Sequence, residues 1–201
     1  MITKIAISKG QLFPIVLRYT DIRSYAFTAV FILLDICMPW VFHQFHLAGP
    51  TFLPMHIFVL VGGLLFGWRV GLMVGFLTPL ASHAVSGMPV LMILPQIVVE
   101  LSSYGLVAGM LREKFSLRVI WSLIGAMTAG RLALLLTVLI ILYVGGGIYS
   151  PLGPGVSPLA VLWSVIDQGW PGMLIQVVSI PLIVKLLEGS LQMTQRAKIK
   201  R

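Results

Sequence analysis

The sequence predicts an all-α membrane protein, a bundle of six transmembrane helices with its N- and C-termini in the cytoplasm. Composition gives the first reason: of 201 residues, 58% are hydrophobic and 10% are charged. Soluble domains are roughly half apolar and about a quarter charged. A chain this apolar cannot bury its hydrophobic residues in one soluble core, so a bilayer is the expected solvent.

The second reason is the number of apolar segments. A bilayer-spanning helix needs about 20 apolar residues. The second and third segments are short and are interrupted by Gly and Pro, so their ends are the least defined. The six segments cover residues 25–45, 52–68, 70–87, 91–111, 117–144 and 163–188.

The third reason is the placement of Lys and Arg, because thirteen of the fourteen fall on one side of a six-helix arrangement. The loops on the other side, 43–51, 86–91 and 145–162, carry none. The positive-inside rule puts the basic side in the cytoplasm. This pattern accounts for the net charge of +8, so nucleic acid is not an expected partner. The thirteen are Lys4, Lys9, Arg18, Arg23, Arg69, Arg112, Lys114, Arg118, Lys185, Arg196, Lys198, Lys200 and Arg201.

The chain divides into one membrane domain, residues 25–190, and two basic ends. Residues 1–24 are either an amphipathic segment on the inner membrane surface or a frayed tail. Residues 191–201 form a basic cytoplasmic tail. The irregular, Gly- and Pro-rich stretch 144–160 is either a functional lid or a connector. Cys37 is the single cysteine, so no disulfide and no cysteine-based metal site is expected.

Arg131 is the one cation out of place, because it lies near the middle of the fifth segment in "AMTAGRLALLLTVLIIL". An arginine at a helix centre costs about 2.5–3.5 kcal/mol on insertion scales, so a compensating partner is expected. One interpretation is a buried ion pair with Glu100 or Asp35 that fixes helix packing. The other is that the planar guanidinium binds an anionic or carbonyl-bearing ligand. The two are compatible.

Further polar residues lie in the outer halves of four predicted helices, where they could converge on one pocket. Ligand pockets are mostly apolar with a few placed polar groups. Glu100 and Tyr104 share a helix face. The alternative is that these residues are merely interfacial, with Trp170 in an aromatic belt. The set is His56, His83, Glu100, Tyr104, Asp167, Trp170 and Gln176.

Motifs of common enzymes are absent. The chain has no GxxxxGK[ST] for a nucleotide, no HExxH for zinc and no GxSxG for a nucleophilic serine. "SHAVSG", residues 82–87, holds serines and a histidine, but neighbours on a helix point in different directions. We therefore expect no enzyme and no cofactor. A membrane-embedded hydrolase using Ser82, His83 or Ser86 stays as an alternative, and so does a standalone carrier.

The stretch "GPTFLPMHIFVLVGGLLFGWRVGLMVGFLTPLASHAVSGMP", residues 49–89, resembles the substrate-binding (S) components of energy-coupling factor (ECF) vitamin transporters. The family pattern has LPMH opening helix two, a glycine pair near its middle, a glycine-rich turn and then GMP. Three later stretches agree: "ELSSYGLVAGML", "AGR" and "PGMLIQVVSIPLIVKLLE". The resemblance runs from about residue 25 to 190.

This resemblance implies the high-affinity capture subunit of an ECF-type importer of the ABC class, in the plasma membrane of a prokaryote. Its ligand would be a small water-soluble vitamin or precursor: flavin, pantothenate, the pyrimidine of thiamin, folate or a queuosine precursor. Its partners would be a transmembrane scaffold (T) subunit and two ATPase subunits. A missing nucleotide motif is then expected, as are small residues that let the early helices approach closely.

The resemblance also implies roles for residues that match its motifs. Arg131 and Glu100 would shape the polar end of the site, and loops 43–51 and 145–162 would cover it. Helix one of the family carries an AxxxA-like face for the scaffold, and the nearest matches here are Ala26, Ala29 and Val30. The expected substrate-binding residues are Met55, His56, His83, Met88, Glu100, Tyr104, Arg131, Asp167, Trp170 and Gln176.

Overall fold

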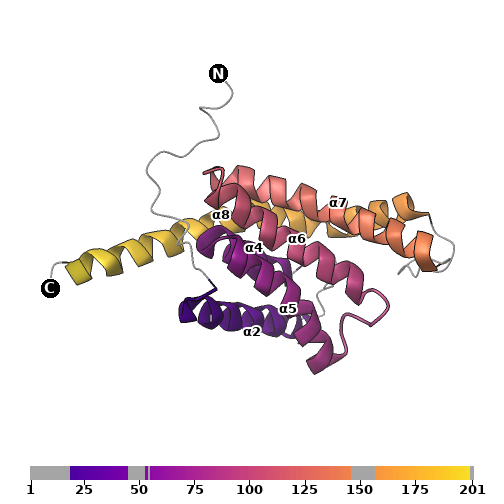
Figure 1. Cartoon of the computed structure of the whole chain (residues 1–201), viewed down its shortest axis with the longest axis horizontal. Helices are drawn as coiled ribbons and strands as arrows, with labels where there is room; N and C mark the ends of the chain where they lie inside the picture. Colours follow the sequence, from indigo (N-terminus) through magenta and orange to yellow (C-terminus); the bar gives the residue numbers. More distant parts are fainter. Residues whose placement is uncertain (1–18, 45–52, 54, 146–156, 200–201) are drawn as a thin grey trace, which may run out of the picture.

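The structure is a computed structural model that describes residues 19–44, 53, 55–145 and 157–199. In these residues all regular secondary structure is helical and no strand occurs, which confirms the predicted all-α class. Figure 1 shows a bundle in which some helices run along the long axis of the molecule and others slant across it. They are α2 (Ile22–Gln44), α4 (Met55–Phe66), α5 (Trp68–Ser86), α6 (Leu94–Glu113), α7 (Val119–Gly145) and α8 (Pro158–Ile199).

Each predicted apolar segment corresponds to one of these helices, but two helices differ clearly in length from the prediction. α4 has only 12 residues, because Gly67 adopts a φ of 87°, which ends the helix before α5 begins. That left-handed conformation favours glycine. α8 has 42 residues and continues beyond the apolar region to Ile199. Its last residues include Gln, Lys and Arg, which are good helix formers, so the helix need not end at the membrane.

Three of the described helices are long and apolar enough to cross a membrane: α6, α7 and the first 32 residues of α8. α4 is apolar but shorter. The remaining spans of the six-helix arrangement, and the cytoplasmic position of the termini, stay predictions.

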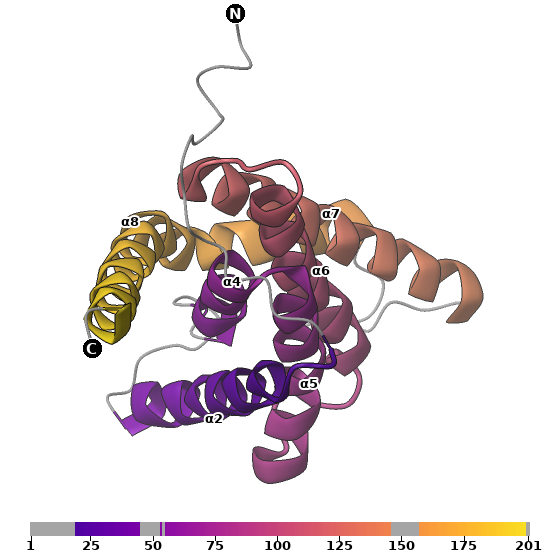
Figure 2. The ribbon, with the colours of Figure 1, turned by 60° about the vertical axis from the view of Figure 1, so that its left-hand side comes forward.

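α4 is the central helix of the bundle. It contacts α2, α5, α6, α7 and α8. Among these five, α2 contacts α5, α5 contacts α6, α6 contacts α7, and α7 contacts α8. In Figure 2 it lies between α8 on one side and α5 and α6 on the other. Nine of its residues are buried, which fits a helix that is apolar on all sides.

Glycines bring α5 and α6 into backbone contact. A Cβ placed on Gly71 would collide with the backbone of Gly105, and one placed on Gly105 would collide with Gly71. Gly75 lies in the same way against the backbone of Leu101. Small residues four apart let membrane helices approach this closely, so van der Waals contact can hold them together. This confirms the expected use of small residues between the early helices.

Asp35 ties α2 to the rest of the bundle. Its carboxylate is fully buried and accepts hydrogen bonds from the Phe58 backbone N–H and the Thr78 hydroxyl, both at 3.4 Å. Phe58 is in the first turn of α4, where backbone N–H groups lack partners within the helix. Asp35 therefore caps α4 from a neighbouring helix.

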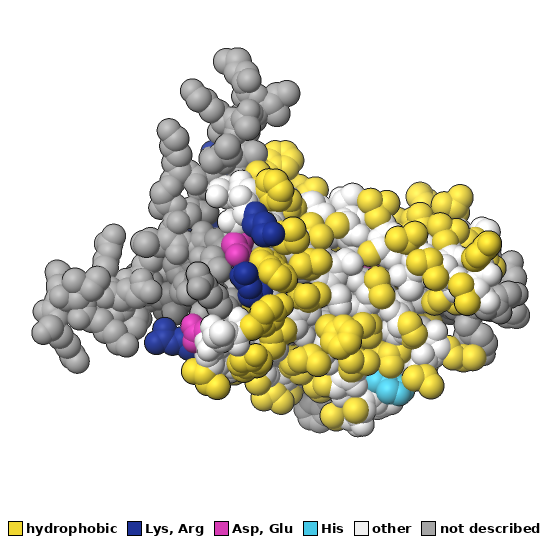
Figure 3. All heavy atoms as spheres, viewed as in Figure 1, with side chains coloured by type: hydrophobic (Ala, Val, Ile, Leu, Met, Phe, Trp, Pro, Cys, Tyr) yellow, Lys and Arg dark blue, Asp and Glu magenta, His cyan; other side chains and the backbone are white. Residues whose placement is uncertain are grey.

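The surface is largely apolar. On the face drawn in Figure 3, hydrophobic side chains cover much of the described surface, and the described charged side chains gather at one end. Two ion pairs join helices at this end, where α5 begins and α6 stops. Arg69 pairs with Glu113 at 3.3 Å, and buried Arg112 pairs with Glu188 of α8.

Several predicted regions lie outside the described residues. They include most of the N-terminal segment 1–24 and nearly all of loop 43–51. Of loop 145–162, residues 146–156 also lie outside, and the chain is helical again from Pro158.

Candidate ligand-binding site

Arg131 forms a buried ion pair with Glu100. The distance from Nη1 to the Glu100 Oε1 is 2.6 Å, and the side chains are only 9% and 6% exposed. Arg131 lies in the middle of α7, and Glu100 lies on α6. The sequence left Glu100 and Asp35 as alternative partners of Arg131. In the structure the partner is Glu100, and Asp35 accepts hydrogen bonds from Phe58 and Thr78. The pair supplies the compensation that an arginine within an apolar helix needs.

Tyr104 and His56 complete the surroundings of the Glu100 carboxylate. Gly130 precedes Arg131, and a Cβ there would lie 2.8 Å from the Tyr104 ring, so the bare glycine makes room for Tyr104. Tyr104 lies one turn further along α6 than Glu100, on the same face of the helix. The His56 ring packs edge-on against Tyr104, with ring centres 5.0 Å apart. Its Nε2 lies 4.0 Å from the Glu100 Oε1.

The backbone of Leu53 joins α8 to this group. The Leu53 carbonyl accepts hydrogen bonds from the Gln176 side-chain amide and from the His56 backbone N–H, both at 3.1 Å. Leu53 has a φ of 50°, which is uncommon for a residue with a side chain. A Cβ on Gly169 would lie 3.3 Å from Arg131 Nη2 and 3.1 Å from the Leu53 side chain. The α8 backbone thus runs directly beside Arg131.

We name this group the Arg131 cluster. It contains the side chains of His56, Glu100, Tyr104, Arg131 and Gln176, which α4, α6, α7 and α8 contribute. Each of the five residues is no more than 8% exposed. Five of the ten predicted site residues therefore come together.

Several polar atoms of the Arg131 cluster have no hydrogen-bond partner among the described residues: Nε and Nη2 of Arg131, both ring nitrogens of His56, and Oε1 of Gln176. Buried polar groups in proteins are normally paired, and an unpaired one costs about 1–3 kcal/mol. On the guanidinium, Nε–H and Nη2–H point the same way along one edge, which suits two acceptor atoms at once. These atoms therefore have hydrogen-bonding capacity that the described residues do not use.

The other predicted site residues lie apart from these contacts. The Nδ1 atom of His83 lies 2.8 Å from the Pro89 carbonyl oxygen, within hydrogen-bond distance. Met88 is 59% exposed. Asp167 and Trp170 flank Gly169 on α8, but both are exposed. Met55 is half-buried against the hydrophobic core.

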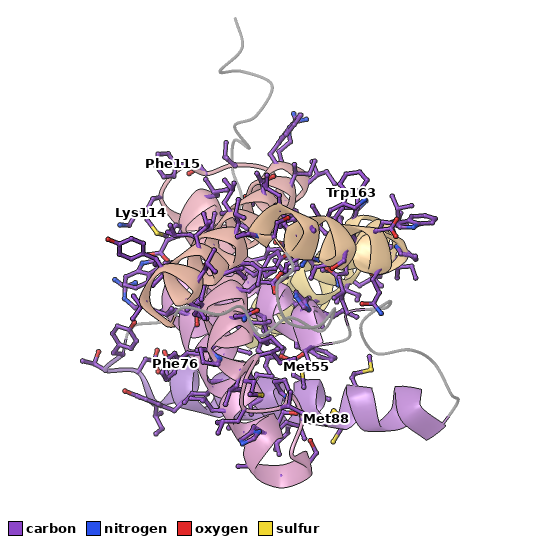
Figure 4. All side chains as sticks on the ribbon, turned by 90° about the vertical axis from the view of Figure 1, so that its right-hand side faces the viewer. Met55, Phe76, Met88, Lys114, Phe115 and Trp163 are labelled. Atoms are coloured by element: carbon purple, nitrogen blue, oxygen red, sulfur yellow. The ribbon has the colours of Figure 1, made fainter. Side chains whose placement is uncertain are left out.

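Figure 4 shows how the labelled side chains lie around the bundle. Trp163 of α8 and Phe76 of α5 lie at the periphery, in keeping with their 71% and 48% exposure. Phe76 also lines a shallow, wholly apolar hollow on the surface of α5, with Leu72, Met73 and Leu77. That hollow is separate from the residues of the Arg131 cluster and offers no polar group to a ligand.

The residues of the alternative hydrolase make local contacts instead. The Ser86 hydroxyl donates to the Ser82 carbonyl at 2.8 Å, and His83 contacts Pro89. No contact between a serine hydroxyl and His83 is seen in this part of the described chain. The described residues also contain no group of three or more His, Cys, Asp or Glu side chains that could hold a metal ion.

The profile of one protein family, described as ECF transporter, substrate-specific component, matches residues 23–184. The chain belongs to this family. The match covers α4 to α7 completely and includes every residue of the Arg131 cluster. No curated protein and no solved structure matches the chain.

Family membership confirms the resemblance drawn from the sequence. ECF S components are membrane transport proteins that bind small vitamin ligands and work with T and ATPase subunits; the family is not an enzyme family. The apolar helices of the structure agree with a membrane protein.

Two participants in the site were not predicted. The Leu53 carbonyl is a backbone group, which every residue type carries, so no sequence signal marks it. Gly169 acts by lacking a side chain beside Arg131. Its position before Trp170 was visible in the sequence, but its neighbour on α7 was not.

Proposed function

We propose that this S component captures a small water-soluble vitamin or precursor from outside the cell at the Arg131 cluster. The T subunit and two ATPase subunits then drive uptake across the plasma membrane of a prokaryote. The observation that carries the proposal is the buried Arg131–Glu100 pair, which leaves one edge of the guanidinium unpartnered among the described residues. A buried edge without acceptors costs about 1–3 kcal/mol, which a ligand that accepted from it would recover.

The proposed topology has six membrane spans, residues 25–190, with residues 1–24 and 191–201 on the cytoplasmic side. His56 is in the first turn of α4, and Glu100 is in the first half of α6. In this topology both helices begin on the outer side, so the Arg131 cluster is nearer the outside. The charged end with Arg69 and Arg112 is then cytoplasmic, as the positive-inside rule requires.

The proposed scaffold contact is the outward face of α2. Ala26, Ala29 and Val30 are exposed, whereas Thr28 and Asp35 on the opposite face are buried. Small exposed side chains on a membrane helix allow a neighbouring helix to approach closely. This supports a contact with the T subunit along that face.

An uptake assay tests the proposal. Cells that lack vitamin uptake would carry the chain alone, the chain with T and ATPase subunits, or the latter with Arg131→Ala. We expect uptake of a radiolabelled vitamin only with all subunits, and its loss in Arg131→Ala. Lys185→Ala, at an exposed position of α8, is the control that should transport normally. Uptake by the chain alone would instead support a standalone carrier.

The alternative hydrolase receives no support from the contacts of Ser82, His83 and Ser86. We therefore propose no catalytic role for them.

A further inference from the structure

The Arg131 cluster is balanced in charge before any ligand arrives. Its one cation, Arg131, is already paired with its one carboxylate, Glu100. The other buried carboxylate, that of Asp35, accepts hydrogen bonds from Phe58 and Thr78 instead. An anionic ligand would bring a second negative charge into a buried site. The penalty for a buried, uncompensated charge is large, so the existing balance favours a neutral ligand group.

The unpartnered atoms define the complementary edge of that group. Arg131 offers two donors, Nε–H and Nη2–H, and Gln176 offers one acceptor, Oε1. The amide nitrogen of Gln176 is held by the Leu53 carbonyl, which fixes the orientation of its oxygen. A matching ligand therefore presents two adjacent acceptors and one N–H or O–H donor.

Bare backbone and aromatic rings surround the Arg131–Glu100 pair. Gly169 presents bare backbone next to Arg131 Nη2, and the aromatic rings of His56 and Tyr104 lie on the Glu100 side. His56 has both ring nitrogens unpartnered among the described residues. Because a neutral imidazole can donate from one nitrogen and accept at the other, it adapts to either kind of ligand atom.

We infer that the ligand is a neutral heterocycle with a lactam-type edge. A ring carbonyl and a neighbouring ring nitrogen or second carbonyl accept from the open edge of Arg131, and a ring N–H donates to Gln176. This inference rests on the proposed function and narrows it. It favours flavin-type compounds, in which a ring carbonyl lies between an unprotonated ring nitrogen and a ring N–H, and it disfavours acyclic carboxylates such as pantothenate.

The test measures ligand affinity by titration calorimetry with the purified full chain in mild detergent. The probes are riboflavin, which carries two adjacent acceptors and a ring N–H; 7-deazaguanine, whose ring carbonyl adjoins an N–H but no second acceptor; and pantothenate, which carries a carboxylate and no ring. We expect riboflavin to bind, 7-deazaguanine to bind more weakly, and pantothenate not to bind. Arg131→Lys keeps the positive charge but loses the two-donor edge, so affinity should fall about 10- to 100-fold. Lys185→Ala should bind as the wild type does.

A second measurement covers the case in which Arg131→Lys fails to fold. The same heterocycle with its ring N–H methylated is titrated into the wild-type protein, and its affinity should be lower by about tenfold or more. Equal affinity for the methylated compound would overturn the inference.

The outcomes separate this inference from the proposed function. Tight binding of pantothenate, with no binding of either heterocycle, would contradict the inference of a neutral ligand edge. It would still support the proposed capture of a vitamin. If none of the probes binds, mass spectrometry of any co-purified molecule decides between a lactam edge and an anionic group. A protein with neither a bound molecule nor affinity for any probe would overturn both proposals.

Discussion

At the scale of single residues, Arg131 and Glu100 compensate each other's buried charge. Either side chain alone would be a buried charge in an apolar helix, at a cost of several kcal/mol. Together they neutralise one another at 2.6 Å, and the geometry of the guanidinium leaves one edge for another partner. We therefore propose that the same pair serves both packing and recognition.

Removing one member of the pair should be strongly destabilising. Glu100→Ala leaves Arg131 buried without a counter-charge, and we expect a loss of about 3–5 kcal/mol in the free energy of unfolding. Chemical denaturation in detergent micelles measures it. Arg69→Gln is the comparison, because the Arg69–Glu113 pair is partly exposed and such pairs contribute about 0–1 kcal/mol. Similar losses in both variants would contradict a special role for the buried pair.

The sequence identified Arg131 and its two candidate partners from the scarcity of charge in the apolar segments. It could not choose between Glu100 and Asp35, because that depends on how α6, α7 and α2 are placed around α4. It also included His83, which instead contacts Pro89 close by in the chain. Polarity and depth mark a residue as a candidate, but the direction of its side chain follows from packing.

At the scale of helices, close packing of α5 on α6 depends on glycine. Gly105→Ala would place a methyl group against the backbone of Gly71, and overpacking of this kind costs about 1–3 kcal/mol. We expect a lower melting temperature and less folded protein by size-exclusion chromatography.

Gly189→Ala is the matched control for that substitution. A Cβ at Gly189, in α8, meets nothing within 4 Å, and alanine favours the helix by about 1 kcal/mol over glycine. This variant should melt at the wild-type temperature or slightly above it. A Gly105→Ala protein as stable as Gly189→Ala would contradict the packing argument.

The attachment of α2 should depend on Asp35. Asp35→Ala leaves the Phe58 N–H and the Thr78 hydroxyl without their acceptor, and we expect a loss of about 1–3 kcal/mol in unfolding free energy. Asp35→Asn keeps an acceptor oxygen and should lose less. Thermal unfolding of the two variants side by side measures the difference. An Asp35→Asn protein less stable than Asp35→Ala would count against the capping role.

All six helices could be predicted from the apolar segments, because runs of hydrophobic residues bounded by Gly, Pro or charge mark them well. The residues at which these helices begin and end could not be predicted. α4 is shortened by the conformation of Gly67, and α8 continues past Gly189 because nothing in its polar end forbids a helix. The central position of α4 was also beyond prediction, since it depends on contacts between distant segments.

At the scale of the whole molecule, the six-span topology has its own test. In a Cys37→Ser background, Leu91→Cys and Phe115→Cys each place one cysteine at an exposed position, the first in the α5–α6 turn and the second in the α6–α7 turn. A membrane-impermeant maleimide should label Leu91→Cys in intact cells. It should label Phe115→Cys only after permeabilisation, and the reverse pattern would invert the topology.

The central claim is that the Arg131 cluster holds a vitamin. The most direct measurement is mass spectrometry of small molecules that co-purify with the wild-type protein and with Arg131→Ala, each confirmed as folded by size-exclusion chromatography. We predict a stoichiometric heterocyclic vitamin or precursor in the wild type and its absence from Arg131→Ala. A molecule retained equally by both proteins, or none in the wild type, would contradict the account.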